Sequence, residues 1–360
     1  IFDDHNFLKL FQELIPMNFA AIEIGSNAVR MIVGEVRGSC ALHVRESWSA
    51  HLRLGDSVFE CGKISEKIFQ QLLQTIRGLL QEIKKFPQIK VSISATSALR
   101  DAKNSISVVA RLKRLLGYPV KILSGIEESQ CLQNGVNSFL PHSLLMESPL
   151  KQTFLVDLGG GSLEISLLKS VSDKNNNQKN ILYSFDIGTL RLRKFKNVTQ
   201  YLESKLPEEF SELSQVLSAN PQDRSHLILT GGNAKTFARL LPQISKKYQS
   251  DNSSAKHNKN WLSMDWNEFE RIEQIFQKQS AEEQQKRWKL RAQQTEIFNI
   301  ALAVFRKIGR ELRTEKLSIP FFGLKESLLL SLVSENIEKP MQEIRLVLTS
   351  GPPKKFKICT

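Results

Sequence analysis

The sequence is poor in cysteine and contains no long apolar run. Its 360 residues include four cysteines, at positions 40, 61, 131 and 359, and no two of them form a C-x-x-C pair. No histidine stands at ligand spacing from them, which argues against structural zinc and favours a reduced protein of the cytoplasm. No apolar run reaches the roughly 18 residues that span a bilayer, so we expect no membrane association.

The N-terminal stretch lacks the marks of a secretory leader. It has neither a basic start nor a small-residue cleavage site. Because an initial Met is missing, we expect a trimmed or fragmentary chain. Apolar side chains at positions 7, 8, 11 and 14 instead predict a short helix that ends near Pro16.

Two nucleotide-binding motifs are also missing. Neither G-x-x-x-x-G-K-[ST] nor G-x-G-x-x-G occurs, which argues against a P-loop and against a Rossmann dinucleotide site. No nucleic-acid recognition module is visible, although the formal net charge is +13. A positive surplus of this size favours an anionic partner, which can be a phosphate-rich ligand, nucleic acid or a membrane surface. The plain alternative is that the charge only keeps the protein soluble.

A repeated hairpin organises the chain. The stretches 20–36 and 154–170 share a strand, an acid, a glycine turn and a second strand, with Glu23 and Asp157 as the acids. The length of 360 residues and the hydrophobic content of 41% suit two domains, because single cores stop growing at about 250–300 residues. The repeat therefore predicts a duplicated α/β architecture with a cleft between two lobes.

The remaining pattern alternates helices and strands. We expect helices over 65–85, 107–117 and 126–139, short strands over 90–94, 119–123 and 181–188, and a strand, Gly-Gly and a helix over 226–241. Ser65 can cap the first of these helices, and Gly117 can end the second. Two acids, Glu127 and Glu128, open the helix over 126–139, where negative charge suits the positive end of the helix.

Three glycine turns each follow an expected strand, at residues 25–27, 159–162 and 231–233. Glycine has no Cβ, so neighbouring N–H groups can converge on one anion, and a following helix start adds positive potential. One such turn alone is more often structural. Three of them, two beside acids in a repeated hairpin, favour phosphate binding.

Seven stretches occur in the order typical of the exopolyphosphatase/guanosine pentaphosphate phosphohydrolase family. They are AIEIGSNAVRMIVGEV, ISATSALRDAKN, ILSGIEESQCLQNGV, LVDLGGGSLEISLL, FDIGTLRLRKF, LILTGGNAKTFARL and GLKESLLLSL. The sequence resembles this family over residues 18–333. The family belongs to the actin/sugar-kinase/Hsp70-like superfamily, and its longer members carry an extra helical region for which this chain is too short.

The resemblance implies two RNase-H-like lobes with an actin-like ATPase fold. It gives an N-terminal extension over 1–17, lobe I over 18–150, lobe II over 151–334 and a basic C-terminal tail over 335–360. The implied activity is hydrolysis of terminal phosphates of polyphosphate or guanosine pentaphosphate.

The resemblance also assigns roles to carboxylates. Glu128 matches the family's proposed general base, which must orient and deprotonate water. Asp157 and Glu164 match the acids of D-x-G-G-G-S-x-E, where Mg²⁺ or Mn²⁺ would separate them from a phosphate, and Glu164 also helps to position the nucleophile. Glu23 stands where the family has a metal-binding Asp, and Glu127 is the neighbour to which we assign a structural role.

The expected phosphate ligands are backbone amides, polar side chains and arginines. They are Gly25, Ser26, Asn27, Arg30, Arg100, Gly159, Gly160, Gly161, Ser162, Gly231, Gly232, Asn233 and Arg291. Arg100 is the leading cation, whereas Arg30 and Arg291 are equally well explained as surface arginines.

The sequence departs from the family pattern at several motif positions. Glu23 replaces Asp, Gln130 replaces an Arg, Leu163 and Asn233 each replace a Thr, and Ser327 replaces a Gly. These changes concern metal geometry and the level of activity, while Glu128, the glycine run and the two acids around it are retained.

Other functions stay open beside the hydrolase. A diverged member could bind polyphosphate or an alarmone nucleotide without turning it over. A sugar or acetate kinase of the same superfamily would need an acceptor, and the stretch SGIEES argues against it. A long polyanion suits the basic chain, whereas no aromatic or amide cluster marks a guanine pocket. We expect the lobes to close over substrate, and we leave a homodimer open.

Overall fold

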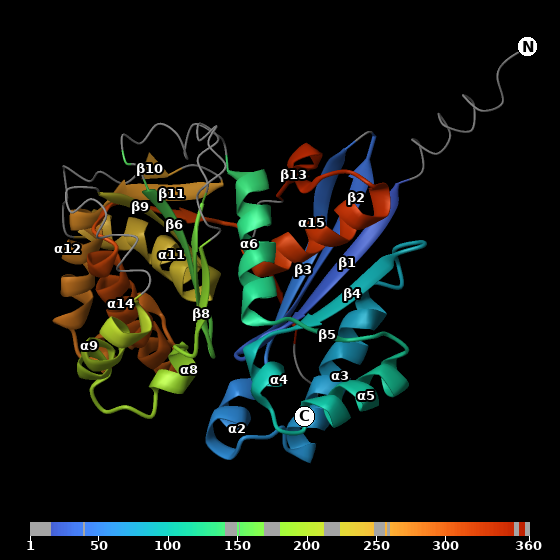
Figure 1. Cartoon of the computed structure of the whole chain (residues 1–360), viewed down its shortest axis with the longest axis horizontal. Helices are drawn as coiled ribbons and strands as arrows, with labels where there is room; N and C mark the ends of the chain where they lie inside the picture. The colour runs from blue at the N-terminus through green and yellow to red at the C-terminus, as the bar shows by residue number, and fades with distance from the viewer. Residues whose placement is uncertain are drawn as a thin grey trace, which may run out of the picture. The chain divides into compact units, whose positions relative to one another are not determined.

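The chain folds as two compact units, each built around its own sheet (Figure 1). This computed structural model describes residues 16–38, 40–140, 150, 152–168, 181–211, 224–247, 256–257, 260–348 and 353–356. Unit 1 draws on Ile1–Phe139 and Gly323–Thr360, and unit 2 on Leu140–Phe322. The helix expected near the N-terminus lies outside the described residues.

Unit 1 has a sheet in the order β13-β3-β2-β1-β4-β5, with β14 also paired to β3. Its strands are β1 (Met17–Ile24), β2 (Ala28–Arg37), β3 (Ala41–His51), β4 (Lys90–Ala95), β5 (Lys121–Ile122), β13 (Arg345–Val347) and β14 (Lys354–Lys355). Its helices are α2 (Leu54–Cys61), α3 (Glu66–Glu82), α4 (Ser97–Asp101), α5 (Ser105–Leu116), α6 (Gly125–Phe139), α15 (Leu324–Ile337) and the 3₁₀ turn η1 (Met341–Glu343).

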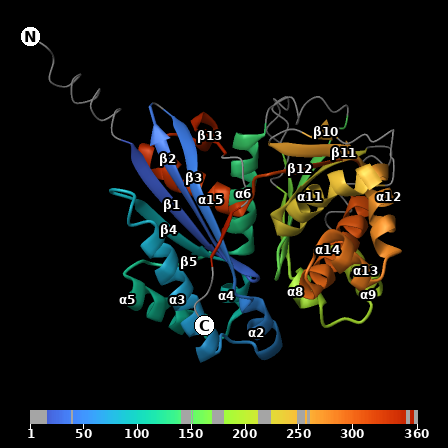
Figure 2. The same ribbon diagram turned by 180° about the vertical axis from the view of Figure 1, so that it is seen from behind.

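Helices cover both faces of the unit 1 sheet (Figures 1 and 2). Apolar residues of α3 and α5 form one core with alternate residues of β1 and β2. On the other face α15 packs on β1 and β2, and Gly34 leaves room for Leu329, whose Cδ2 would lie 3.0 Å from a Cβ at position 34. The expected caps are confirmed, because Ser65 accepts a hydrogen bond from Ile68 at the start of α3 and Gly117 ends α5 at φ 77°.

Unit 2 has a sheet in the order β10-β11-β12-β9-β6-β7-β8. Its strands are β6 (Gln152–Leu158), β7 (Leu163–Leu167), β8 (Leu182–Phe185), β9 (Ser225–Thr230), β10 (Lys256–His257), β11 (Trp261–Asp265) and β12 (Thr314–Pro320). Its helices are α8 (Thr189–Leu192), α9 (Val198–Glu209), α11 (Gly231–Lys247), α12 (Trp266–Gln277), α13 (Ala281–Trp288) and α14 (Ala292–Glu311).

The duplication predicted from the sequence is confirmed in the strand order. In unit 1, β1 pairs antiparallel with β2 and parallel with β4. In unit 2, β6 pairs antiparallel with β7 and parallel with β9. Each repeated hairpin therefore sits in the same setting within its own α/β unit.

Two details differ from the sequence-based expectations. The strand expected over 181–188 ends at Phe185, and the chain then turns into the short helix α8. Helix α15 belongs to unit 1, whereas the boundary at residue 334 taken from the family resemblance placed most of this helix in lobe II. Within the C-terminal stretch, β13 and β14 both pair with β3 at one edge of the unit 1 sheet, and Phe356 packs beside Gly78 of α3. Among the described helices, none is long and apolar enough to cross a membrane.

Candidate active site

Two buried carboxylates stand opposite each other in the unit 2 hairpin. Asp157 of β6 pairs with Glu164 of β7 in the strand register, and their exposed fractions are 8% and 2%. The preceding pair, Val156 and Ile165, faces the hydrophobic core of unit 2. Because side chains alternate along a strand, both acids point to the opposite face of the sheet. Carboxylate oxygens of the two residues lie within 4.8 Å of each other.

Neighbouring strands hold these acids in place with hydroxyl groups. Thr230 of β9 is fully buried and donates its hydroxyl to Asp157 Oδ1 at 2.9 Å. Ser184 of β8 donates to Glu164 Oε1 at 3.1 Å. Sequence reasoning missed both hydroxyls, since only the pairing of β9 and β8 with the hairpin brings them there.

A glycine makes room beside the first acid. Gly231 follows β9 at φ 90°, in the left-handed region, and a Cβ at this position would lie 2.7 Å from Asp157 Oδ1. A side chain would therefore be strained and would also collide with the carboxylate. The sequence predicted a functional turn here, and the close approach to Asp157 gives the physical reason for its first glycine.

The residues of this cluster fit a hard divalent cation. Like charges on directly opposed residues of a sheet repel each other, and burial strengthens the repulsion. The donor set consists of oxygen atoms alone, as Mg²⁺ and Mn²⁺ prefer. Asp157 and Glu164 could hold such an ion.

The glycine turn between the two strands offers backbone donors. Gly159 donates its N–H to Ser162 O at 2.9 Å, which closes the turn. Within the described part of the chain, the N–H groups of Gly160, Gly161 and Ser162 have no hydrogen-bond acceptor. Buried N–H groups are rarely left without a partner, and Gly161 and Ser162 are buried. These amides are therefore suited to an anionic ligand.

In the corresponding hairpin of unit 1, the acid is neutralised by an arginine of the same hairpin. Glu23 of β1 pairs with Arg30 of β2 in the register, and Arg30 Nη1 donates to Glu23 Oε1 at 2.7 Å. The Gly25 N–H closes the turn on Ala28 O, and the Ser26 hydroxyl lies 2.8 Å from that of Ser97 at the start of α4. Both Glu23 and Arg30 thus already have an oppositely charged partner.

A second ion pair of unit 1 joins α4 to α6. Arg100 Nη1 donates to Glu128 Oε2 at 3.1 Å and to Leu123 O at 2.9 Å. Glu128 is only 6% exposed. The residue predicted as the general base and the leading phosphate-binding cation are therefore direct neighbours.

Glu127 caps the helix that carries Glu128. Its carboxylate accepts a hydrogen bond from the Ser124 N–H at 2.8 Å, and its own N–H donates to Ser124 Oγ at 3.1 Å. The Ser124 N–H, followed by Lys121 and the Ser124 hydroxyl, lowers the pKa of Glu127 to about 2. This geometry supports the structural role expected for Glu127.

Three further predicted ligands lie at the starts of unit 2 helices. Gly232 and Asn233 belong to the first turn of α11, directly after Gly231. Arg291 precedes α14 and its Nε donates to Gln294 Oε1 at 3.3 Å. Arg291 is exposed, as a surface arginine would be, and its role as a phosphate ligand stays a prediction.

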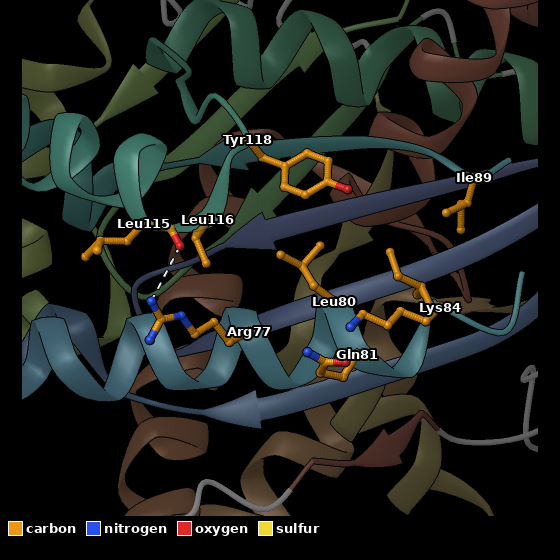
Figure 3. Close-up of a pocket in the computed structure, with 9 residues that line it drawn as sticks. Arg77, Leu80, Gln81, Lys84, Ile89, Leu115, Leu116 and Tyr118 are labelled. Atoms are coloured by element: carbon orange, nitrogen blue, oxygen red, sulfur yellow. Dashed lines mark hydrogen bonds between the residues drawn. The ribbon is translucent and has the colours of Figure 1, made fainter.

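Unit 1 also contains a cavity of about 280 Å³ (Figure 3). Its walls come from α3, the end of α5 and Tyr118, and Arg77 donates to Leu115 O across it. None of the predicted catalytic or phosphate-binding residues lines it. The cavity therefore contributes nothing to the assignment of the site.

Comparison with known proteins gives a family and a fold. The sequence matches the family described as "Ppx/GppA phosphatase family" over residues 31–336. An exopolyphosphatase from Cytophaga hutchinsonii is similar in structure, with a TM-score of 0.72 and 17% identity over 90% of this chain and 99% of that chain.

Two structures from Aquifex aeolicus are also similar. A Ppx/GppA family member has a TM-score of 0.67 and 21% identity, and covers 89% of this chain and 99% of its own. A structure described as the PPX-GPPA enzyme has a TM-score of 0.63 and 24% identity, and covers 88% of this chain and 100% of its own. At these identities the likeness establishes the shared fold.

Proposed function

Because the chain belongs to the Ppx/GppA phosphatase family, we propose that it hydrolyses terminal phosphoanhydride bonds and releases orthophosphate. Polyphosphate and guanosine pentaphosphate are the two substrates considered. The observation that carries the proposal is the unit 2 hairpin, where two buried acids flank a turn with unsatisfied amide donors within the described residues.

The amides of the turn would bind the terminal phosphate. Phosphoryl transfer spreads negative charge over the equatorial oxygens, and fixed N–H donors stabilise that charge without reorganising. Gly160, Gly161 and Ser162 supply such donors, and the start of α11 at Gly231 and Gly232 adds the positive end of a helix.

Asp157 and Glu164 would hold Mg²⁺, with Mn²⁺ as the alternative. The ion would neutralise the two acids and polarise the phosphate oxygens. Glu23 stays a predicted metal ligand, but its salt bridge with Arg30 at 2.7 Å means that an ion must compete with the guanidinium.

Glu128 is the proposed general base. A general base must be ionised to accept a proton from water, and the Arg100 guanidinium at 3.1 Å stabilises the charged carboxylate. Arg100 would also contact the phosphate, so that one cation would position both the general base and the substrate.

Polyphosphate is the better match of the two substrates. A long polyanion gains from positive charge beyond its reacting end, and the net charge of +13 supplies it. A diverged protein that binds polyphosphate without hydrolysis is the second candidate. The internal ion pair of Glu23 favours it, because the acid of this hairpin is already paired with a cation.

The test compares two neighbouring acids of one helix. Purified protein is incubated with Mg²⁺ and either long-chain polyphosphate or guanosine pentaphosphate, and orthophosphate is quantified for wild type, Glu128→Gln and Glu127→Gln. We expect release from polyphosphate, a fall of at least about a hundredfold in kcat for Glu128→Gln, and a change within about twofold for Glu127→Gln. Tight binding of polyphosphate without release by wild type would establish the binding protein instead.

A further inference from the structure

The carbonyl groups of the three glycines of this turn are all held by one short segment. Helix α8 follows β8 in unit 2 (Figure 1). Its first N–H groups, of Thr189 and Leu190, donate to Gly159 O at 3.1 Å and to Gly160 O at 2.8 Å. The Arg191 guanidinium completes the series, because its Nε donates to Gly161 O at 2.5 Å. Three consecutive carbonyls thus face α8.

This arrangement fixes the direction of three amides. In a planar trans peptide, the C=O of one residue and the N–H of the next point in opposite directions. When α8 holds the carbonyls of Gly159, Gly160 and Gly161, the N–H groups of Gly160, Gly161 and Ser162 must point away from α8. They are the three donors that have no acceptor among the described residues.

Gly188 permits the close approach of the two segments. A Cβ at Gly188 would lie 2.4 Å from Gly160 O and 2.4 Å from Gly161 Cα. Any side chain there would separate α8 from the turn, and the carbonyl bonds would be lost. The glycine is thus required by contact with the turn rather than by its own φ.

We propose that Arg191 is a positioning residue for phosphate binding. By holding the Gly161 carbonyl, its side chain orients the Ser162 N–H toward the phosphate. This inference rests on the proposed function for the identity of the ligand. Thr189 and Leu190 hold the turn through their backbone N–H groups, whereas Arg191 acts through its side chain. Its contribution can therefore be removed without altering the backbone. Its second contact, from Nη2 to Asp186 Oδ1 at 3.2 Å, involves a largely exposed acid and steadies the guanidinium.

The test replaces Arg191 and uses a nearby arginine as the control. Arg193 lies two residues further along, and its Nε donates to Glu296 of α14. We compare Arg191→Met, Arg191→Lys and Arg193→Met by KM for polyphosphate, inhibition constant for orthophosphate, and kcat. We expect KM and the inhibition constant to rise about tenfold in Arg191→Met, since a hydrogen bond to a charged ligand contributes about that much.

A purely structural role would give a different pattern. Loss of folded protein lowers kcat and leaves both KM and the inhibition constant unchanged. We expect Arg191→Lys to recover part of the affinity, because an ammonium group can still donate to the carbonyl, and Arg193→Met to resemble wild type. Equal KM and inhibition constants in Arg191→Met and Arg193→Met would overturn the inference.

A structural readout separates this inference from the proposed function. Crystal structures of wild type and Arg191→Met would give the orientation of the Gly161–Ser162 peptide. We expect this peptide to turn or to occupy two orientations in the variant, and an unchanged peptide would overturn the inference whether or not the protein is active. Wild type that neither binds nor releases orthophosphate would contradict the proposed function alone.

Discussion

The two repeated hairpins share one backbone arrangement and differ in charge. In unit 1 an acid and a base oppose each other, Glu23 and Arg30, while in unit 2 the equivalent positions hold two acids, Asp157 and Glu164. Glu23 and Arg30 are as far apart in the sequence as Asp157 and Glu164 are. The duplicated backbone has therefore been kept while its charges diverged.

The difference shows which hairpin is built for stability and which for a ligand. An opposed acid and base stabilise a hairpin, whereas two opposed acids destabilise it until a cation or a proton is added. Residues that break a local rule of stability are often those that serve function. The unit 2 hairpin is accordingly the better candidate for metal and phosphate chemistry.

The largest expected effect comes from removing an acid in each hairpin. Glu164→Gln should lower kcat by about a hundredfold to a thousandfold, because a charged group at the reacting phosphate is lost. Glu23→Gln should lower it by about tenfold at most, since that carboxylate is already bound to Arg30. Orthophosphate release at saturating polyphosphate and Mg²⁺ measures both. Equal losses in the two variants would break the comparison.

A second effect concerns stability and should have opposite signs in the two hairpins. Arg30→Met leaves the buried Glu23 without its ion-pair partner and should lower the free energy of unfolding by about 2 kcal/mol, less than for a fully buried pair. Glu164→Gln should raise it by about 0.5 kcal/mol in metal-free buffer, because the repulsion from Asp157 is removed. Urea denaturation with and without Mg²⁺ measures these values.

The double variant Glu23→Gln/Arg30→Met provides the control for this pair. Without either charge the hairpin should recover most of the stability lost in Arg30→Met. A destabilised Glu164→Gln in metal-free buffer would show that the two acids of unit 2 do not repel each other.

The smallest effect extends the comparison to two adjacent acids of unit 1. Glu127 is half exposed, and its folded-state pKa is lowered from 4.5 to about 2. A lowered pKa stabilises the fold above pH 4.5, and this contribution is lost as the pH falls from about 4.5 toward 2. Because solvent screens the charge, Glu127→Gln should cost about 0.5 kcal/mol at pH 7. Urea denaturation of both proteins at pH 7 and pH 3 should show a smaller gap at pH 3, and a gap that grew would contradict this.

The hairpins and capped helices could be predicted from the sequence because their signals are local. Alternation of apolar residues marked β1, β2, β6 and β7, and Ser65 marked the start of α3. Asp157 and Glu164 could be placed together because a tight turn fixes the register of a hairpin.

The rest depended on contacts between segments that are distant in sequence. Helix α8 was missed because nothing local shows that Gly188 must fit against Gly160. Thr230 could not be linked to Asp157 before the pairing of β9 with β6 was known. Family resemblance indicated Glu128, but its ion pair with Arg100 required the packing of α6 against α4.

The return of α15 to the first sheet has a consequence for synthesis on the ribosome. Unit 1 is interrupted by the whole of Leu140–Phe322, and the helix that covers one face of its sheet is translated only afterwards. At roughly 5–20 residues per second, that face of the nascent sheet stays bare for about 10 to 40 seconds. During this interval the unfinished domain exposes apolar surface of the kind that chaperones bind.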